Sequence, residues 1–230
     1  MMKEKLKNFW DKRAEALSEM SQLENVIFQN DSERAKLYEE GELAVIGREL
    51  NITESTVLLD LGAGVGRHTL RFAKKAKHVT AVEFTSEYAK QIEMQAKREN
   101  LKNIEVINTP AEMFCRPDYA DIVFVSGMFL CLDNEQYDTT ANNVVKTLKK
   151  GGTLFIRESI SLLDEAFIVD RFSEELQMDY CALYRTQKQF IDTFQNYGLK
   201  LIVSDKLFDD GSILNRRTET RMYYFVFQKS

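Results

Sequence analysis

The stretch LLDLGAGVGRHTLRF, from Leu58 to Phe72, carries three glycines at alternate positions directly after an apolar run and an aspartate. Glycine lets the backbone turn tightly, and its missing side chain lets a ligand reach the backbone N–H groups. Asp60 precedes the first glycine, Gly62, and a second acid, Glu83, follows 21 residues after that glycine. A carboxylate at this spacing can accept two hydrogen bonds from the hydroxyl pair of a ribose. These residues therefore predict a site for a nucleoside-bearing ligand.

The elements around this stretch alternate between strands and helices. Short apolar runs predict parallel strands at 56–61, 78–84, 104–108, 120–127 and 153–159. Between them we expect helices at 67–76, at 87–100 with Ser86 as the cap, and at 135–150 ending at Gly151 and Gly152. Such alternation is typical of a doubly wound sheet, in which ligands bind beyond the carboxyl ends of the strands.

The two ends of the chain depart from this alternation. A helix at 187–198, with Thr186 as its expected cap, precedes strands at 199–208 and 221–229 with no helix between them. Strands joined without a crossover helix pair antiparallel, so we expect these two at the sheet edge. At the other end, amphipathic runs predict helices at 2–20 and 32–50.

The spacing of the glycines distinguishes two kinds of nucleoside site. A dinucleotide fingerprint requires G-x-G-x-x-G, but the third glycine position counted from Gly62 holds Arg67. The pattern D-x-G-x-G-x-G resembles the first motif of the class I S-adenosylmethionine-dependent methyltransferases, and the likeness covers roughly residues 56–160. It implies an α/β, Rossmann-like, doubly wound seven-stranded sheet with an antiparallel last strand. It also implies an N-terminal helical lid at 1–50 and a cofactor-binding domain at 51–230, together forming one structural unit.

The same resemblance implies a role in binding S-adenosyl-L-methionine, or its product S-adenosyl-L-homocysteine, for individual residues. Asp60 would meet the cofactor's ammonium, Glu83 would hold the ribose hydroxyls, and Phe84 would lie against the adenine. Arg67 lies in GAGVGRHT, which resembles the protein N-terminal methyltransferases, and would pair with the cofactor's carboxylate. Residues expected around the methionine part, the adenine edge and the sulfonium are Gly62, Ala63, Gly64, Ala111, Glu112, Met113, Ser126, Gly127 and Met128.

The sequence indicates the methyl acceptor less clearly than the cofactor. Transfer from a sulfonium is an in-line substitution in which positioning supplies much of the catalysis, so few residues are compulsory. Glu158 ends a strand over the expected acceptor cavity and is the candidate catalytic residue. Candidate substrate-binding residues come from strand ends, the lid helices and the loop at 212–221, and are Trp10, Tyr38, Arg157, Tyr184, Arg185, Asn215 and Arg216. Phe28 and Glu42 belong to the same expected lid helices.

Composition narrows the classes of acceptor. The net charge of -5 contrasts with the basic excess of nucleic-acid binders, and no apolar run is long enough to span a bilayer. Three scattered cysteines outside any zinc-binding spacing indicate reduced thiols and a cytoplasmic setting without a metal. The sequence predicts methyl transfer to a nitrogen or oxygen of a small metabolite or natural product, with neither nucleic acid nor membrane as partner.

Two alternatives stay open. One is a protein or peptide methyltransferase of the N-terminal type, although Cys131 stands where that family has a histidine. The other is an inactive cofactor-binding protein that serves a partner.

Overall fold

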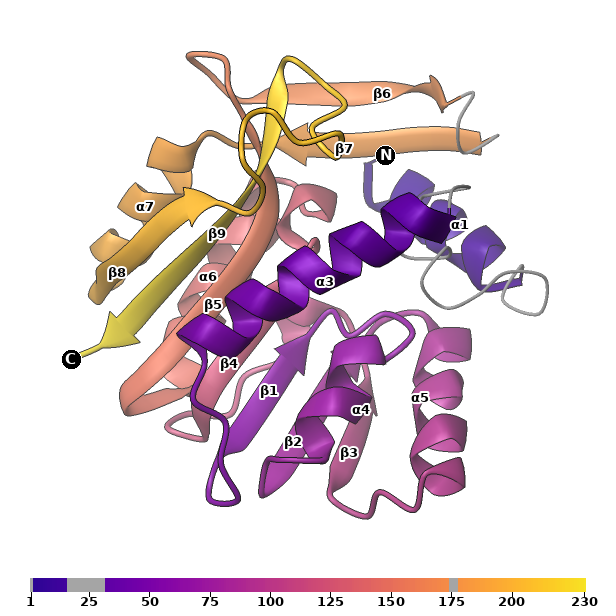
Figure 1. The fold of residues 1–230 in the computed structure, drawn as a ribbon, viewed down its shortest axis with the longest axis vertical. Coiled ribbons are helices and arrows are strands. Elements are labelled where there is room, and N and C mark those ends of the chain that lie inside the picture. The colour runs from indigo at the N-terminus through magenta and orange to yellow at the C-terminus, as the bar shows by residue number, and fades with distance from the viewer. Residues whose placement is uncertain (1, 16–31, 174–177) are drawn as a thin grey trace.

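The computed structural model describes residues 2–15, 32–173 and 178–230. Its centre is a seven-stranded sheet in the order β3-β2-β1-β4-β5-β9-β8 (Figure 1). Its strands are β1 (Val57–Leu61), β2 (His78–Glu83), β3 (Ile104–Asn108), β4 (Ala120–Ser126), β5 (Leu148–Ser161), β8 (Leu199–Lys206) and β9 (Thr220–Lys229). The first five strands are parallel, whereas β9 runs antiparallel to both β5 and β8. The expected Rossmann-like sheet with a reversed last strand is therefore confirmed.

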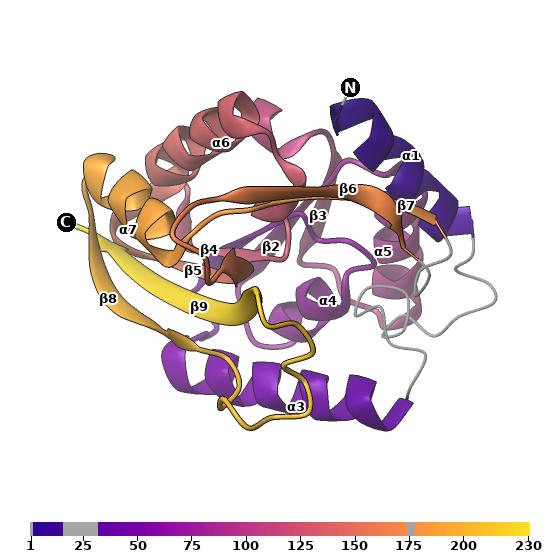
Figure 2. The same ribbon diagram turned by 90° about the horizontal axis from the view of Figure 1, so that it is seen from above.

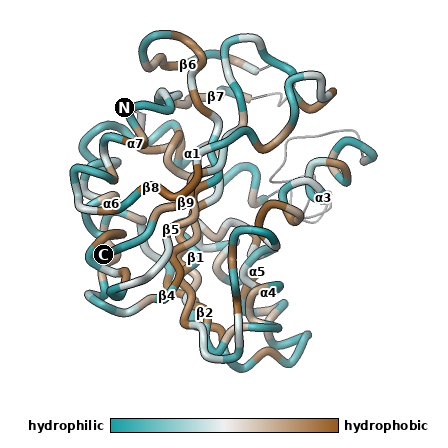
Figure 3. The backbone as a smooth tube through the Cα atoms, turned by 60° about the vertical axis from the view of Figure 1, so that its left-hand side comes forward, coloured by the Kyte–Doolittle hydropathy of each residue, from teal (hydrophilic) through white to brown (hydrophobic). Residues whose placement is uncertain are grey.

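Helices cover both faces of this sheet (Figure 2). They are α3 (Ser32–Glu49), α4 (Arg67–Ala73), α5 (Ser86–Arg98), α6 (Asn134–Thr147) and α7 (Gln187–Asn196). Side chains alternate along a strand, so Leu59 and Val123 pack with α6 and α7 while Leu58 and Phe124 pack with α3 and α4. The central strands are accordingly the hydrophobic part of the chain, and hydrophilic segments lie around them (Figure 3).

The helix α3 belongs to the core of the sheet. Val45, Ile46 and Leu50 are buried in the same apolar cluster as residues of β1, β4 and β9. The expected boundary at residue 50 therefore does not divide two separate cores. The first helix, α1 (Met2–Glu15), lies apart from α3, beside β7 and α5. The rest of the helix expected at 2–20, and Phe28, lie outside the described residues.

A two-stranded sheet that the sequence did not predict lies over the carboxyl ends of the central strands. Its strands, β6 (Phe167–Ser173) and β7 (Met178–Tyr184), pair antiparallel and cross the top of the molecule in Figure 1. The α1 helix packs against it, with the ring of Phe9 at 5.9 Å from the ring of Tyr180. Lys5 also donates to Asp170 of β6 at 2.8 Å. The α1 helix and the hairpin together form a layer above the sheet, which we call the roof.

Several predicted helix boundaries are wrong by a few residues, and two of these differences have a clear structural reason. The α6 helix ends at Thr147, and β5 then runs through Gly151, where a positive φ of 76° accompanies a break in the register with β4. The glycines thus permit an irregular strand and do not cap the helix. The cap residue of α5 is Thr85 and not Ser86, because the Thr85 backbone is extended and Ser86 is already the first helical residue. No helix in the described parts of the chain is long and apolar enough to cross a membrane.

Candidate active site

A cavity of about 310 Å³ lies between the carboxyl ends of the central strands and the roof. Its wall combines the glycine loop after β1, the ends of β2, β4 and β5, and side chains of α1, β7 and the loop before β9. This is the position at which open α/β sheets bind their ligands. The volume is in the range of small-molecule and cofactor sites.

The glycine loop between β1 and α4 is shaped for close approach of a ligand. Gly62, Gly64 and Gly66 have φ angles of 77°, 56° and 81°, in the region that side chains disfavour. A Cβ atom on Gly62 would also lie 2.6 Å from Cγ of Met128. Conformation and packing therefore both require glycine at the first position, where the backbone forms the cavity wall.

Glu83 holds this loop from the end of β2. One carboxylate oxygen accepts a hydrogen bond from the Gly64 N–H at 2.7 Å, and the other accepts from the Thr85 N–H at 2.8 Å. A carboxylate has about four acceptor positions, so two remain for hydroxyl donors of a ligand. Burial raises the pKa of Glu83, and further donors would favour its ionised form. The position fits the ribose of an adenosyl group.

Asp60 is a second buried acid at the same end of the cavity. The Thr69 hydroxyl donates to it at 2.5 Å, and only 2% of the residue is exposed. Burial raises the pKa of Asp60 to about 7. A nearby cation would offset the cost of burying its charge. The ammonium of S-adenosylmethionine would add a positive charge beside this carboxylate.

A buried network joins α3 to both the glycine loop and β5. Glu42 of α3 accepts hydrogen bonds from Arg157 Nε at 2.8 Å, from the Ser126 hydroxyl at 3.1 Å and from Arg67 Nη2. His68 Nε2 lies 3.3 Å from the same carboxylate. Arg67 and Arg157 also line the cavity, so both have a protein partner as well as a face toward the ligand.

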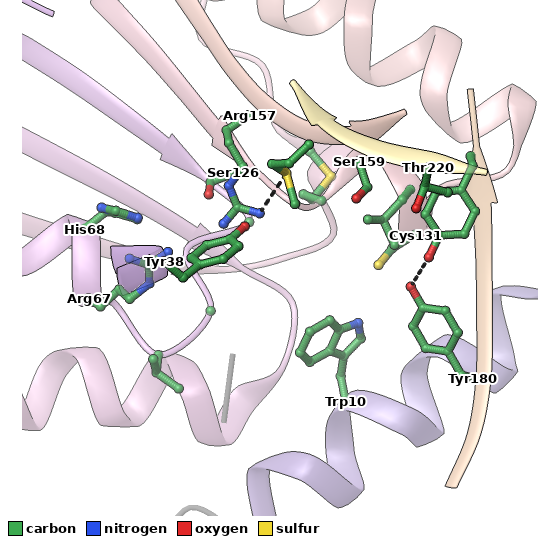
Figure 4. A pocket seen from close by; sticks show the side chains of 18 of the residues that line it. Trp10, Tyr38, Arg67, His68, Ser126, Cys131, Arg157, Ser159, Tyr180 and Thr220 are labelled. Atoms are coloured by element: carbon green, nitrogen blue, oxygen red, sulfur yellow. Dashed lines mark hydrogen bonds between the residues drawn. The ribbon is translucent and has the colours of Figure 1, made fainter. Parts of the chain in front are cut away.

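The opposite end of the cavity is aromatic and lies under the roof. Figure 4 shows Trp10, Cys131 and Tyr180 around one space. The Tyr180 and Tyr184 hydroxyls are 3.0 Å apart, and Arg217 donates to Tyr184 at 3.2 Å. Burial raises the pKa of the Cys131 thiol to about 12, which keeps it protonated at neutral pH. This end offers aromatic faces and hydroxyl groups to a small ligand.

Most of the residues expected from the sequence line this cavity. They are Trp10, Tyr38, Asp60, Gly62, Ala63, Gly64, Arg67, Glu83, Phe84, Ser126, Gly127, Met128, Arg157, Tyr184, Asn215 and Arg216. The structure thus brings together both ends of the chain and the strand ends between them.

Glu158 and Arg185 differ from expectation because they do not line the cavity. Glu158 is fully buried, and its carboxylate accepts from the Leu130 and Ser159 N–H groups at 3.3 and 3.2 Å. Arg185 donates to the carbonyl oxygens of Phe129, Leu132 and Asp133 at 2.9 to 3.1 Å and stacks on Tyr137. Both side chains hold the segment around η3 (Phe129–Cys131). They support the cavity wall from behind.

The expected adenine-edge residues also lie away from the cavity wall. They form the short helix η2 (Ala111–Met113). Met113 is 73% exposed, and Glu112 accepts a hydrogen bond from Gln136 of α6 at 2.8 Å.

The sequence predicts no individual role at the site for Glu42 or Tyr180, whereas Arg217 lies in the loop at 212–221 that was expected near the substrate. Glu42 and Arg157 are 115 positions apart, so no local pattern marks them as partners. Tyr180 lies on the hairpin strand β7, which has no counterpart in the expected topology.

Comparison with known proteins decides the family. The family described as "Methyltransferase domain" matches residues 58–152, which include the glycine loop and Glu83. Residues 58–152 thus match a methyltransferase domain, and the match supports a class I S-adenosylmethionine-dependent methyltransferase. The expectation drawn from the glycine motif is confirmed.

Among curated relatives, phosphoethanolamine N-methyltransferase 1 of Triticum aestivum is 31% identical over 156 residues, which are 66% of this chain and 30% of that protein. (S)-coclaurine N-methyltransferase of Thalictrum flavum subsp. glaucum is 30% identical over 131 residues, 56% of this chain and 36% of that protein. The chain thus spans only about a third of the length of these curated relatives.

Solved structures share the fold. Phosphoethanolamine N-methyltransferase 1 of Haemonchus contortus, in complex with phosphoethanolamine and S-adenosylhomocysteine, superposes with a TM-score of 0.76 at 17% identity. The match covers 99% of this chain and 48% of that one. N-methyltransferase NodS of Bradyrhizobium japonicum WM9, in complex with S-adenosylhomocysteine, gives a TM-score of 0.65 at 15% identity, over 96% and 98% of the two chains.

Proposed function

We propose that the protein transfers a methyl group from S-adenosylmethionine to an amine nitrogen of a small molecule. The observation that carries this proposal is the continuity of one cavity from the glycine loop to the aromatic space under the roof. Two curated relatives with N-methyltransferase names, for phosphoethanolamine and for coclaurine, support nitrogen over oxygen as the acceptor atom.

In this proposal the cofactor end binds through residues at the ends of β1 and β2 and at the start of α4. Glu83 accepts hydrogen bonds from the ribose hydroxyls, Asp60 faces the ammonium, and Arg67 pairs with the carboxylate. Phe84, 38% exposed in the cavity wall, covers the adenine. The bound cofactor supplies an activated methyl group. The protein's own task is to hold the acceptor in line with it.

The acceptor end suits an amine that also carries an anionic group. Aromatic faces of Trp10 and Tyr180 favour the cationic centre that forms when nitrogen gains a methyl group. Arg217 and Arg221 line the same end and would pair with a phosphate or carboxylate on the acceptor. The side chain of Arg221 is 16% exposed, which limits competition from water. A small zwitterion, with an amine for the aromatic faces and an anionic group for the arginines, would fit this end of the cavity.

An acceptor screen tests this proposal. Purified protein is incubated with S-adenosylmethionine and, separately, with phosphoethanolamine, ethanolamine, a benzylisoquinoline amine and a peptide with a free amino terminus. We expect mass spectrometry to find a product heavier by one methylene with phosphoethanolamine, and a weaker reaction with ethanolamine, which lacks the anionic group.

The other arms separate the alternatives. Methylation of the peptide alone would contradict the proposal and favour the protein N-terminal type. Binding of S-adenosylhomocysteine with no methylated product from any amine would favour an inactive cofactor-binding protein. Absence of S-adenosylhomocysteine binding would overturn the assignment of the cofactor end.

A further inference from the structure

Two arginines of the cavity wall converge on one buried carboxylate. Arg67 comes from the first turn of α4 and Arg157 from the end of β5, and their side chains are only 10% and 11% exposed. Glu42, which takes a hydrogen bond from each, is fully buried. Figure 4 shows Arg67, His68, Ser126 and Arg157 at this end of the cavity. Three elements that are distant in the sequence meet at Glu42.

Both guanidinium groups share the Glu42 carboxylate as a hydrogen-bond acceptor. Although burial acts to raise it, the pKa of Glu42 is held well below its usual range by the charges of Arg157 and Arg67. Burial lowers the pKa of His68 to about 4, so this ring is neutral near pH 7. Two guanidinium groups thus donate to a single carboxylate. The neighbouring acid Glu39 is 2.8 Å from Arg71 but 3.9 Å from Arg67, so it compensates Arg67 only weakly.

Glu42 also determines which donors of Arg67 remain for a ligand. It occupies Nη2 of that guanidinium. Nη1 is buried and has no hydrogen-bond partner among the described residues. A buried donor without an acceptor is costly and calls for a partner that the protein does not supply. Glu39 Oε1 is 3.9 Å from Nη1, beyond hydrogen-bond distance, and Arg67 lines the cavity, so a ligand can supply the missing acceptor.

We propose that Glu42 is the positioning residue of the cofactor's carboxylate: it fixes Arg67 so that Nη1 points to that carboxylate. The inference rests on the proposed function, since it takes S-adenosylmethionine as the ligand. Glu42 touches neither the methyl group nor the acceptor and acts through Arg67. Its contribution is therefore to cofactor selectivity, and a ligand without the carboxylate gains nothing from it.

The test compares two ligands that differ only in this group. S-adenosylhomocysteine has the carboxylate, and decarboxylated S-adenosylhomocysteine keeps the ammonium, ribose and adenine but lacks it. Calorimetric titration of Glu42→Gln should show about tenfold weaker binding of the first ligand and less than about a twofold change for the second. Glu40→Gln is the matched control, because this acid of α3 is exposed, pairs with Lys36 and does not line the cavity, and it should change neither affinity.

The outcomes separate positioning from general packing. Equal weakening of both ligands in Glu42→Gln would mean that Glu42 only holds α3 on the sheet, and unchanged binding of both would mean that Arg67 needs no such support. Either result overturns the inference. If Glu42→Gln does not fold, Glu42→Asp keeps the charge with a shorter reach, and the same comparison applies. Wild-type protein that binds neither ligand overturns the proposed function itself.

Discussion

Glu83 connects the end of β2 to the glycine loop through hydrogen bonds from the Gly64 and Thr85 N–H groups. Its two remaining acceptor positions are those that we assign to the ribose hydroxyls. Glu83→Gln removes the charge and one acceptor oxygen, so we expect S-adenosylhomocysteine binding to weaken by about 1.5–3 kcal/mol. Calorimetric titration measures this change.

The control for this variant is Glu87→Gln. Glu87 lies four residues further on, in the first turn of α5, and does not line the cavity. Its substitution should leave the affinity unchanged. A Glu83→Gln protein that melts like the wild type and binds with the same affinity would disprove the ribose assignment.

Asp60 makes the cofactor affinity depend on pH. Burial raises its pKa from 3.8 to about 7 in the ligand-free protein. An ammonium group beside it favours the ionised carboxylate, so binding releases a proton below about pH 7. Affinity for S-adenosylhomocysteine should therefore rise with pH, by up to about tenfold per unit below pH 7, and level off above it.

The same pKa shift has the opposite effect on ligand-free stability. The stabilisation that Asp60 gives the ligand-free protein is fully present below its unfolded pKa of 3.8. This stabilisation is lost as the pH rises through the folded pKa of about 7. Titrations across this range should show rising affinity while the free energy of unfolding of the ligand-free protein falls. Asp60→Asn should bind weakly at every pH, and a wild-type affinity that is flat across the range would exclude the ammonium contact.

At this scale, the sequence is informative where function depends on neighbours along the chain. The glycine loop and Glu83 are marked by local spacing, and they line the cavity. Glu158 and Arg185 carry the same functional groups as residues that line the cavity. Their side chains, however, point to backbone groups around η3. Side-chain direction depends on packing between distant elements, so residue type alone does not determine it.

At the scale of elements, α7 offers a test of local stabilisation. Its expected cap, Thr186, is confirmed: the hydroxyl accepts from the Gln189 N–H at 3.2 Å, and the Gln189 side chain accepts from the Thr186 N–H at 2.8 Å. This capping box begins the helix that buries Phe190 and Phe194 against the sheet. Thr186→Ala should lower the free energy of unfolding by about 1 kcal/mol.

Chemical denaturation measures that loss, and Thr218→Ala is the matched control. Thr218 lies in the loop before β9, where it starts no helix, so its substitution should change the stability by less than about 0.5 kcal/mol. Equal effects of the two variants would mean that the cap does not stabilise α7. Cofactor affinity should be unaffected, since Thr186 does not line the cavity.

Elements with strong local signals were predicted, and those set by tertiary contacts were not. The five parallel strands contain apolar runs, mostly buried in β1, β2, β4 and β5 and half-buried in β3, and their existence follows from the sequence alone. The β6–β7 hairpin gives no comparable signal, because Ile168 and Phe172 on β6 are exposed while Asp170 pairs with Lys5. Its position depends on α1, which is more than 150 residues away in the sequence.

At the scale of the whole molecule, the cavity joins parts of the chain that are far apart. The α1 helix, β7 and the loop at 212–219 close over a site whose base is the glycine loop. A ligand that fills the cavity therefore contacts all of these segments at once. Binding should stabilise the roof and this loop together with the base, because local opening of any of them would expose the ligand.

Amide hydrogen exchange can detect this coupling. With saturating S-adenosylhomocysteine we expect slower exchange in the glycine loop and in α1, and a further slowing in β7 and the loop at 212–219 when an acceptor is added. The α6 helix packs on one face of the sheet and does not line the cavity, so it is the internal control. Its exchange rates should be unchanged. Slowing confined to the glycine loop under both conditions would show that the roof does not close on the ligands, and the acceptor would then have to bind at an open surface.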